Sequence, residues 1–396
     1  MTSTPTLQNI SLKIHDNGRD HDRPPIVQAL LDSICLSSTL SSGRPLLTHL
    51  NADTTWLLSL PRPVSEHSTP IRERSRVFYH VLIDPWLRGG QSDVAKFFSQ
   101  QWHAQESVMQ SIREVEDLIK DVEVMAAERS STEGTAGLNP GRSECEQEDR
   151  YEEDMDNESY IDAVVISHEF TDHMHKETLL EINPRVPVFA TTKAASVIRS
   201  WKHSDFVAEI PRFMGDWRAS SIDPLPKWLG VSRVAYAGSD MLYYHSAIMI
   251  AFTILENETE QRTEAEAIIY TPHGVSPDDV APVAKAEPSI KTLALLHGLQ
   301  DIYISRPIGA QLNKGAHNGL KIQRLLDAKH WIATHDEVKK GGEIVSWFLR
   351  RRILTLQEAV EREKLDKGKE LKGGELEAMA EVRFRELGNG ESLILE

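Results

Sequence analysis

Short apolar runs separated by turn residues recur along most of the chain from about residue 44. The run Ile161–Ile166 is rich in β-branched residues, which is typical of a buried strand. Residues 45–61 read as two strands joined at Asn51-Ala52-Asp53, and this predicts a hairpin. Further strands are predicted at 76–84, 187–191, 231–237, 242–255, 265–271, 292–296 and 330–334.

Helical periodicity is clearest at residues 104–127. Apolar residues recur there at steps of four and three, which predicts a helix with one face packed on a core: Val108, Ile112, Val115, Ile119 and Val122. A coiled-coil seam is the alternative, although the stripe spans barely three heptads. Further helices are predicted from about residue 174, at 192–201 and at 318–327, so the second half alternates strand and helix. The sequence therefore predicts an α/β protein.

The chain divides into three regions that differ in amino-acid composition. Residues 1–42 read as a polar tail with one short helix, residues 43–345 as the main domain, and residues 346–396 as a charged, helical C-terminal extension broken at Gly373-Gly374. Within the main domain, residues 128–159 are poor in apolar side chains, and nine of the fifteen residues from 144 to 158 are acidic. We expect a disordered acidic insertion there, with an acidic metal-binding tract as the alternative.

Charge and cysteine content narrow the function classes. The 396-residue chain has a formal charge of −16, which disfavours non-specific binding to nucleic acid or anionic membranes. It has two cysteines, no apolar segment typical of a secretory signal, and a longest apolar run, Ala247–Leu255, that is too short to cross a bilayer. These features predict a cytoplasmic protein without structural disulfides or a transmembrane segment.

Histidines gather at the ends of the predicted strands. His168, Asp172 and His173 follow one strand directly, His273, His297 and His335 follow three others, and His245 lies near the start of its strand. Imidazole and carboxylate groups that meet at one sheet edge would suit zinc. The alternative for the first group is that Asp172 caps the following helix and the histidines lie on the surface.

In order and spacing, these residues resemble the metallo-β-lactamase fold superfamily over residues 44–345. The first family motif, His-x-His-x-Asp-His, falls on residues 168–173. His245 corresponds to the later lone histidine, Tyr270-Thr271-Pro272-His273 to the strand end resembling YTGD, and His335 to the closing histidine. The similarity is greatest to the branch of the ascorbate-phosphate lactonases and the N-acyl phosphatidylethanolamine phospholipases D. The resemblance implies a four-layer αββα sandwich with metal bound at its edge.

Two positions depart from the family pattern. Phe170 replaces the second motif histidine, and His273 replaces the aspartate that bridges two metal ions. The resemblance makes these six residues the metal candidates: His168, Asp172, His173, His245, His273 and His335. The departures favour one zinc ion, held by Asp172, His173 and His335 with His273 as a fourth candidate, over the family's two ions.

The resemblance implies metal-assisted hydrolysis of an ester, lactone or phosphodiester bond in a small-molecule or lipid-like substrate. Asp172 is the candidate to orient or deprotonate the attacking water. A non-catalytic binding or scaffold protein with a decayed metal site is the alternative within this fold, and a plain α/β scaffold with scattered histidines is the alternative outside it. The sequence gives no oligomeric state.

Overall fold

The computed structural model describes residues 43–63, 76–93, 96–134, 159–234, 245–253, 264–304, 310–341, 347, 349–367 and 382–396. The predicted N-terminal tail and short helix lie outside these ranges, as do Gly373-Gly374 and residues 135–158 of the expected acidic insertion.

The first of two large sheets contains the predicted hairpin. Its strand order is β18-β1-β2-β3-β5-β6-β7, with β1 and β2 antiparallel and β3, β5, β6 and β7 parallel to one another. The strands are β1 (Leu46–His49), β2 (Trp56–Pro61), β3 (Phe78–Ile83), β5 (Ala163–Ile166), β6 (Val188–Ala190), β7 (Val207–Glu209) and β18 (Ser392–Ile394).

The second sheet has the order β17-β14-β11-β10-β9-β8, and its strands β10, β11, β14 and β17 are parallel. The strands are β8 (Leu229–Arg233), β9 (Ile248–Phe252), β10 (Ala265–Thr271), β11 (Ile290–His297), β14 (His330–Ile332) and β17 (Phe384–Arg385). Two smaller sheets combine β12 (Gln300–Ile304) with β13 (Gln311–Asn313) and β16 (Leu349–Ile353), and β4 (Gln101–Trp102) with β15 (Lys340–Gly341).

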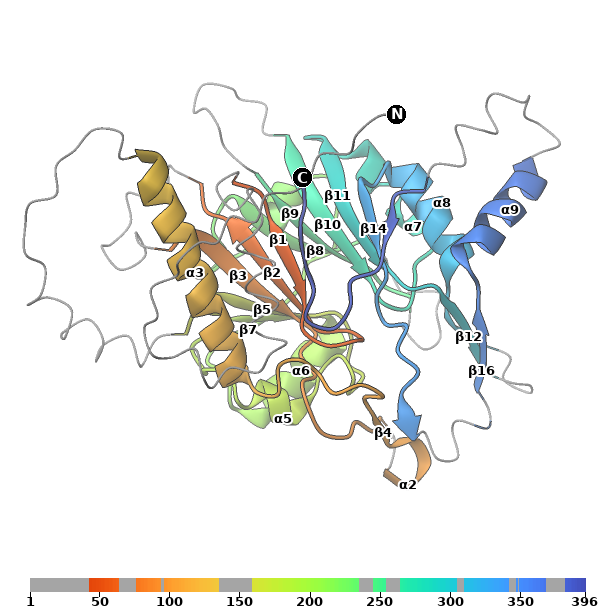
Figure 1. The fold of residues 1–396 in the computed structure, drawn as a ribbon, viewed down its shortest axis with the longest axis horizontal. Helices are drawn as coiled ribbons and strands as arrows, with labels where there is room; N and C mark the ends of the chain where they lie inside the picture. Colours follow the sequence, from red (N-terminus) through yellow and green to blue (C-terminus); the bar gives the residue numbers. More distant parts are fainter. Residues whose placement is uncertain are drawn as a thin grey trace, which may run out of the picture.

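The two large sheets pack face to face, with helices on both outer faces (Figure 1). Alternate residues of each strand point to opposite sides, so Leu58, Val81 and Val165 meet Ile250 and Ile268 in the core between the sheets. The helices and 3₁₀ turns are α2 (Lys96–Ser99), α3 (Ile112–Gly134), α5 (Lys176–Leu179), α6 (Thr192–Trp201), η4 (Trp217–Ser220), α7 (Pro277–Val280), η6 (Val283–Lys285), α8 (Ala316–Leu326) and α9 (Leu356–Lys367).

Each outer layer buries its own apolar face. Val115 and Ile119 of α3 and Ile198 of α6 lie in one cluster with Leu82 of β3. Leu320 of α8 packs in another cluster with Trp331 of β14. The predicted α/β class and the four-layer αββα sandwich are confirmed.

The long helix is shifted from its predicted position. It begins at residue 112 rather than 104 and continues to residue 134, so residues 128–134 are helical and not part of an insertion. In a helix starting at residue 104, the N–H of Val108 would donate to the carbonyl oxygen of Ala104, but it donates instead to Oδ1 of Asn389, 2.9 Å away.

The C-terminal segment joins both sheets. We expected a helical extension, and the segment contains α9, but Phe384–Arg385 pair with β14 and Ser392–Ile394 pair with β1. Leu395 is fully buried between the sheets. The division of the chain into three regions remains a prediction.

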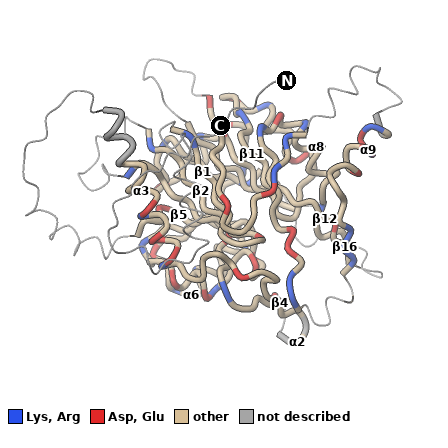
Figure 2. Tube along the Cα trace, in the orientation of Figure 1, with Lys and Arg blue, Asp and Glu red and all other residues tan. Residues whose placement is uncertain are grey.

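Charged residues lie mainly away from the sheet interior. The traces of β1, β2, β5 and β11 are mostly free of charge, whereas β16 carries three consecutive arginines (Figure 2). Within the described parts of the chain, no helix is long and apolar enough to span a membrane.

Candidate metal centre

The predicted site residues emerge where strands of both sheets end. Asp84 and His168 follow the parallel strands β3 and β5, while His273 and His335 follow the parallel strands β10 and β14. The Tyr270 hydroxyl donates to the carbonyl oxygen of Thr54 across the inter-sheet core at 3.3 Å. The sheet ends therefore meet, and residues far apart in sequence come together.

Three imidazoles converge at this edge. One ligand atom each from His173, His273 and His335 lies within 4.8 Å of the other two. The Nε2 atoms of His173 and His273 are 3.0 Å apart, and the ring centroids of the three histidines are separated by 4.9 to 5.0 Å.

Each of these imidazoles is oriented by a hydrogen bond between its Nδ1 and an acceptor oxygen. The Nδ1 of His173 donates to Asp84 Oδ2 at 2.8 Å, and that of His335 donates to Asp53 Oδ1 at 2.9 Å. The Nδ1 of His273 bonds Asn313 Oδ1 at 3.1 Å. Because these oxygens accept, the proton of each neutral ring belongs on Nδ1, and its Nε2 lone pair is available to a cation.

This donor set fits zinc. Zinc accepts imidazole nitrogen readily, and histidine ligands almost always donate their other ring N–H to a carboxylate or carbonyl oxygen. The facing Nε2 atoms of His173 and His273 repel each other unless a cation or a proton lies between them. His173, His273 and His335 are therefore the residues that could hold one metal ion.

A carboxylate group adjoins the imidazoles. Asp53, Asp172 and His335 form a second set whose ligand atoms lie within 4.8 Å of one another. Asp172 Oδ1 lies 3.7 Å from His173 Nε2, so the Asp172 carboxylate lies directly beside the imidazole set. The ammonium of Lys339 contacts Asp172 Oδ2 at 2.5 Å and Asp53 Oδ2 at 2.9 Å.

Burial and charge set the protonation of this cluster. Burial alone would raise the pKa of Asp172, but Lys339 and the nearby histidines hold it well below its usual value. Burial would lower the pKa of His173, but the carboxylates of Asp172 and Asp84 outweigh burial and raise it. Burial and three neighbouring imidazoles hold the pKa of His273 well below the usual value. In the absence of metal, the proton between the two Nε2 atoms therefore belongs to His173.

His168 and Phe170 lie beside the cluster. Their rings stack at 4.5 Å and 12°, and the ring centroids of His168 and His273 are 5.1 Å apart. The Nδ1 of His168 pairs with Glu169 at 3.2 Å. Phe170 thus covers His168 with an apolar ring at the position where the family pattern has a histidine.

His245 approaches from the second sheet. It precedes β9, and Ile248 of β9 pairs with Tyr270 of the antiparallel strand β10. His245 therefore emerges at the sheet end that also carries His273.

The backbone around the site has two residues in the left-handed region. Asp84 has φ 44° and His335 has φ 57°, a conformation that costs non-glycine residues about 1 kcal/mol or more. The N–H of His335 donates to the carbonyl oxygen of Asp53 at 2.9 Å, which holds this turn against the β1–β2 loop.

Sequence reasoning missed several residues of this site. Asp53 was predicted only as part of the hairpin turn, and the sequence patterns did not single out Lys339 or Asn313. Their roles depend on loops from different parts of the chain, so no local pattern could have identified them. His297, in contrast, lies outside the cluster: its Nδ1 donates to the carbonyl oxygen of Gly298 and its Nε2 accepts from Asn318.

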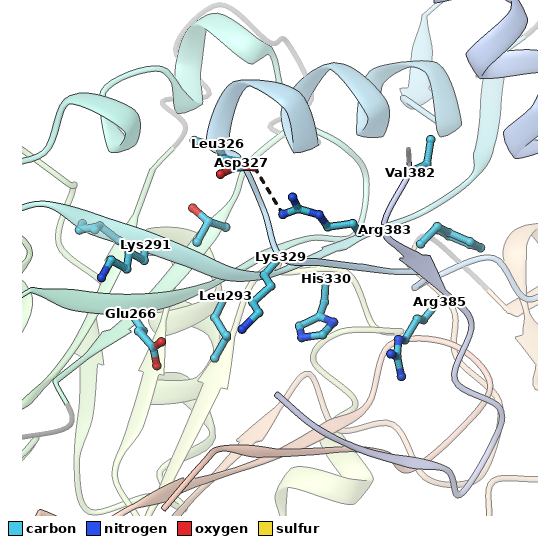
Figure 3. Close-up of a pocket in the computed structure, with 13 residues that line it drawn as sticks. Glu266, Lys291, Leu293, Leu326, Asp327, Lys329, His330, Val382, Arg383 and Arg385 are labelled. Atoms are coloured by element: carbon cyan, nitrogen blue, oxygen red, sulfur yellow. Dashed lines mark hydrogen bonds and ion pairs between the residues drawn. The ribbon is translucent and has the colours of Figure 1, made fainter. Parts of the chain in front are cut away.

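A pocket of about 1080 Å³ lies at the opposite ends of the parallel strands (Figure 3). Lys291, Lys329 and Arg385 line it together with Glu266, and Arg383 pairs with Asp327 at 3.4 Å. None of the imidazoles of the candidate metal centre lines this pocket.

No family model and no curated protein matches the chain. Among solved structures, the chain is similar to isothiocyanate hydrolase from Delia radicum gut bacteria, with 14% identity, 89% of this chain and 99% of that chain covered, and a TM-score of 0.46. It is also similar to a possible metal-dependent hydrolase from Veillonella parvula, with 13% identity, 89% and 100% covered, and a TM-score of 0.47. A third is the metallo-β-lactamase fold protein YhfI from Bacillus subtilis, with 9% identity, 88% and 99% covered, and a TM-score of 0.39. Likenesses this distant assign neither a family nor an activity to the chain.

Proposed function

We propose that this protein is a metal-dependent hydrolase that acts with one zinc ion on an ester, lactone or phosphodiester bond of a small-molecule or lipid-like substrate. The observation that carries the proposal is the convergence of His173, His273 and His335, each oriented through Nδ1 by an acceptor oxygen. Such second contacts fix the ring orientation and raise the basicity of the coordinating nitrogen.

Zinc, when bound, lowers the pKa of a coordinated water to about 7 and polarises the substrate oxygen. Asp172 lies beside the imidazoles and stays ionised, because Lys339 donates to its Oδ2. A carboxylate with so low a pKa accepts a hydrogen bond from water but holds a proton poorly, so Asp172 orients the nucleophile. His273 stays neutral because its pKa is strongly lowered, so it carries no proton for the leaving group, and His168 is the remaining candidate donor.

Hydrolysis of ester, lactone and phosphodiester substrates by purified protein tests the proposal. Activity should disappear with a chelator and return with zinc, and Asp172→Asn should lower kcat by roughly 100-fold or more while leaving zinc bound. His297→Gln is the matched control, because this strand-end histidine lies outside the cluster. A fully active Asp172→Asn variant would contradict the assignment.

A non-catalytic binding or scaffold role is the second candidate. It is favoured by the stacking of Phe170 over His168 and by the engagement of Asp172 with Lys339. Protein that binds zinc tightly, yet hydrolyses none of the three bond types, would favour this second candidate over the first.

A further inference from the structure

Lys339 is a buried cation in the middle of the candidate metal centre. Its side chain is 5% exposed, and its ammonium contacts one carboxylate oxygen each of Asp53 and Asp172. The ammonium also lies 5.3 Å from the ring centroid of Trp86, which shields it from solvent on that side. A buried ammonium is retained only when paired, and this one is paired twice.

The loop that carries Lys339 is held on both sides. Before it, the Glu337 carboxylate accepts hydrogen bonds from the ring nitrogen Nδ1 of His103, 2.8 Å away, and from the backbone N–H groups of Ala104 and Gln105. After it, Lys340 pairs with Trp102 in the β4–β15 sheet. These contacts fix the backbone on both sides of Lys339, and so they help to hold its ammonium in place.

The Lys339 ammonium contacts the carboxylate oxygens that could otherwise coordinate a metal ion. Asp53, Asp172 and His335 have ligand atoms close enough to hold a cation, but Oδ2 of each aspartate is already in contact with the ammonium. A divalent ion on this side would lie within a few ångströms of a fixed positive charge, at a site with little solvent to screen the repulsion. On the imidazole side, His273 Nε2 lies 3.0 Å from His173 Nε2, and His273 Nδ1 bonds the neutral amide oxygen of Asn313.

We propose that the Lys339 ammonium is a built-in cation that takes the place of a second metal ion, so that the centre holds one metal ion on its imidazole side. Removal of the ammonium should open a second cation site between the carboxylates of Asp53 and Asp172, because both lose their ammonium partner. This inference rests on the proposed function to the extent that the imidazoles bind metal.

The test is the zinc content of purified variants after dialysis against buffered zinc. Wild-type protein should hold one zinc ion per chain and Lys339→Met two, because the variant has two buried carboxylates without their cation. Lys339→Arg keeps the charge and should hold one. Lys340→Met is the matched control, since this neighbouring lysine is exposed, and it should also hold one.

The outcomes separate the inference from the proposed function. One zinc ion in both wild type and Lys339→Met would overturn the inference alone, as would two in wild type. No zinc in either protein would overturn the proposed function as well.

A melting experiment covers the case in which Lys339→Met is unstable without metal. Zinc should raise the Tm of this variant more than that of wild type, because a second ion would restore the charge balance that the lysine provided. An equal or smaller rise in Tm would contradict the inference.

Discussion

At the scale of single residues, Asp84 is the residue on which the orientation of His173 depends. Its Oδ1 accepts the N–H of Ser167 at 2.7 Å, and its Oδ2 accepts the Ser167 hydroxyl and Nδ1 of His173. Asp84→Ala should weaken zinc binding by about 10- to 100-fold, because the imidazole loses its orienting acceptor. It should also lower the free energy of unfolding by roughly 3 kcal/mol, since buried donors lose a charged partner.

Titration with a zinc chelator and urea unfolding measure these two effects. Asp205→Ala is the control for an exposed aspartate and should change neither quantity. Unchanged zinc affinity in Asp84→Ala would show that the contact between Asp84 and His173 is incidental.

A second prediction at the residue scale concerns pH. Burial lowers the pKa of His297 to about 4. As pH falls below about 6.5, the unfolded chain gains a proton that the folded chain does not, so stability is full above this pH and is lost between pH 6.5 and 4. The loss attributable to His297 is about 3 kcal/mol.

In the His297→Gln variant, the loss of stability on acidification that is due to His297 should disappear. The loss due to His49, whose pKa burial likewise lowers to about 4, should remain. Urea unfolding of both proteins at pH 4.5 and 7 measures the difference. Equal losses of stability in wild type and variant would contradict the prediction.

The sequence predicted the histidines of the site better than their partners. His173, His273 and His335 became candidates because each follows an apolar strand, and parallel strands bring such positions to one edge. Asp53 and Lys339 were not predicted as site residues, because they form an ion pair only when the β1–β2 loop and the 335–341 loop come into contact. A turn aspartate and one of two adjacent lysines look like ordinary surface residues until that contact is known.

At the scale of elements, Glu123 fastens α3 to β3. Its carboxylate accepts the N–H groups of Val77 and Phe78 at 2.6 and 2.9 Å, and it bonds Nε2 of His80 at 2.8 Å. Glu123→Ala should lower the free energy of unfolding by about 3 kcal/mol, because three buried donors lose a charged acceptor. Thermal or urea unfolding provides the measurement.

Asp117→Ala is the matched control, because its carboxylate lies on the exposed side of the same helix. It should change stability by less than about 0.5 kcal/mol. Equal effects of the two substitutions would mean that Glu123 does not anchor the helix.

Helix prediction succeeded where the apolar stripe was long and failed at the boundaries. The stripe of α3 was recognised, but the helix starts at residue 112 because the N–H of Val108 donates to Asn389, more than two hundred residues away, and not to the carbonyl oxygen of Ala104. Short strands rich in charge, such as β16 with its three arginines, offered no alternation of apolar and polar residues to detect.

At the scale of the whole molecule, the C-terminal segment completes one edge of the first sheet and fills part of the inter-sheet core. Leu46 pairs with Ile394, and the N–H of Leu395 donates to the carbonyl oxygen of Pro45. Deletion of residues 392–396 should lower the free energy of unfolding by roughly 3 kcal/mol, because the buried side chain of Leu395 and the edge strand β18 are lost. It should also promote aggregation through the exposed edge of β1.

Thermal unfolding and size-exclusion chromatography measure these effects. Removal of Glu396 alone is the control, because this terminal residue is exposed and follows the paired segment. A deletion of residues 392–396 with unchanged Tm would mean that the C-terminal strand is dispensable.

The zinc content of the purified wild-type protein tests the central claim most directly. We predict one zinc ion per chain, and we predict that His273→Gln loses most of it whereas His297→Gln retains it. Both histidines end strands of the second sheet, but only His273 contacts the imidazole cluster. Wild-type protein without zinc, or equal zinc loss in the two variants, would contradict the account.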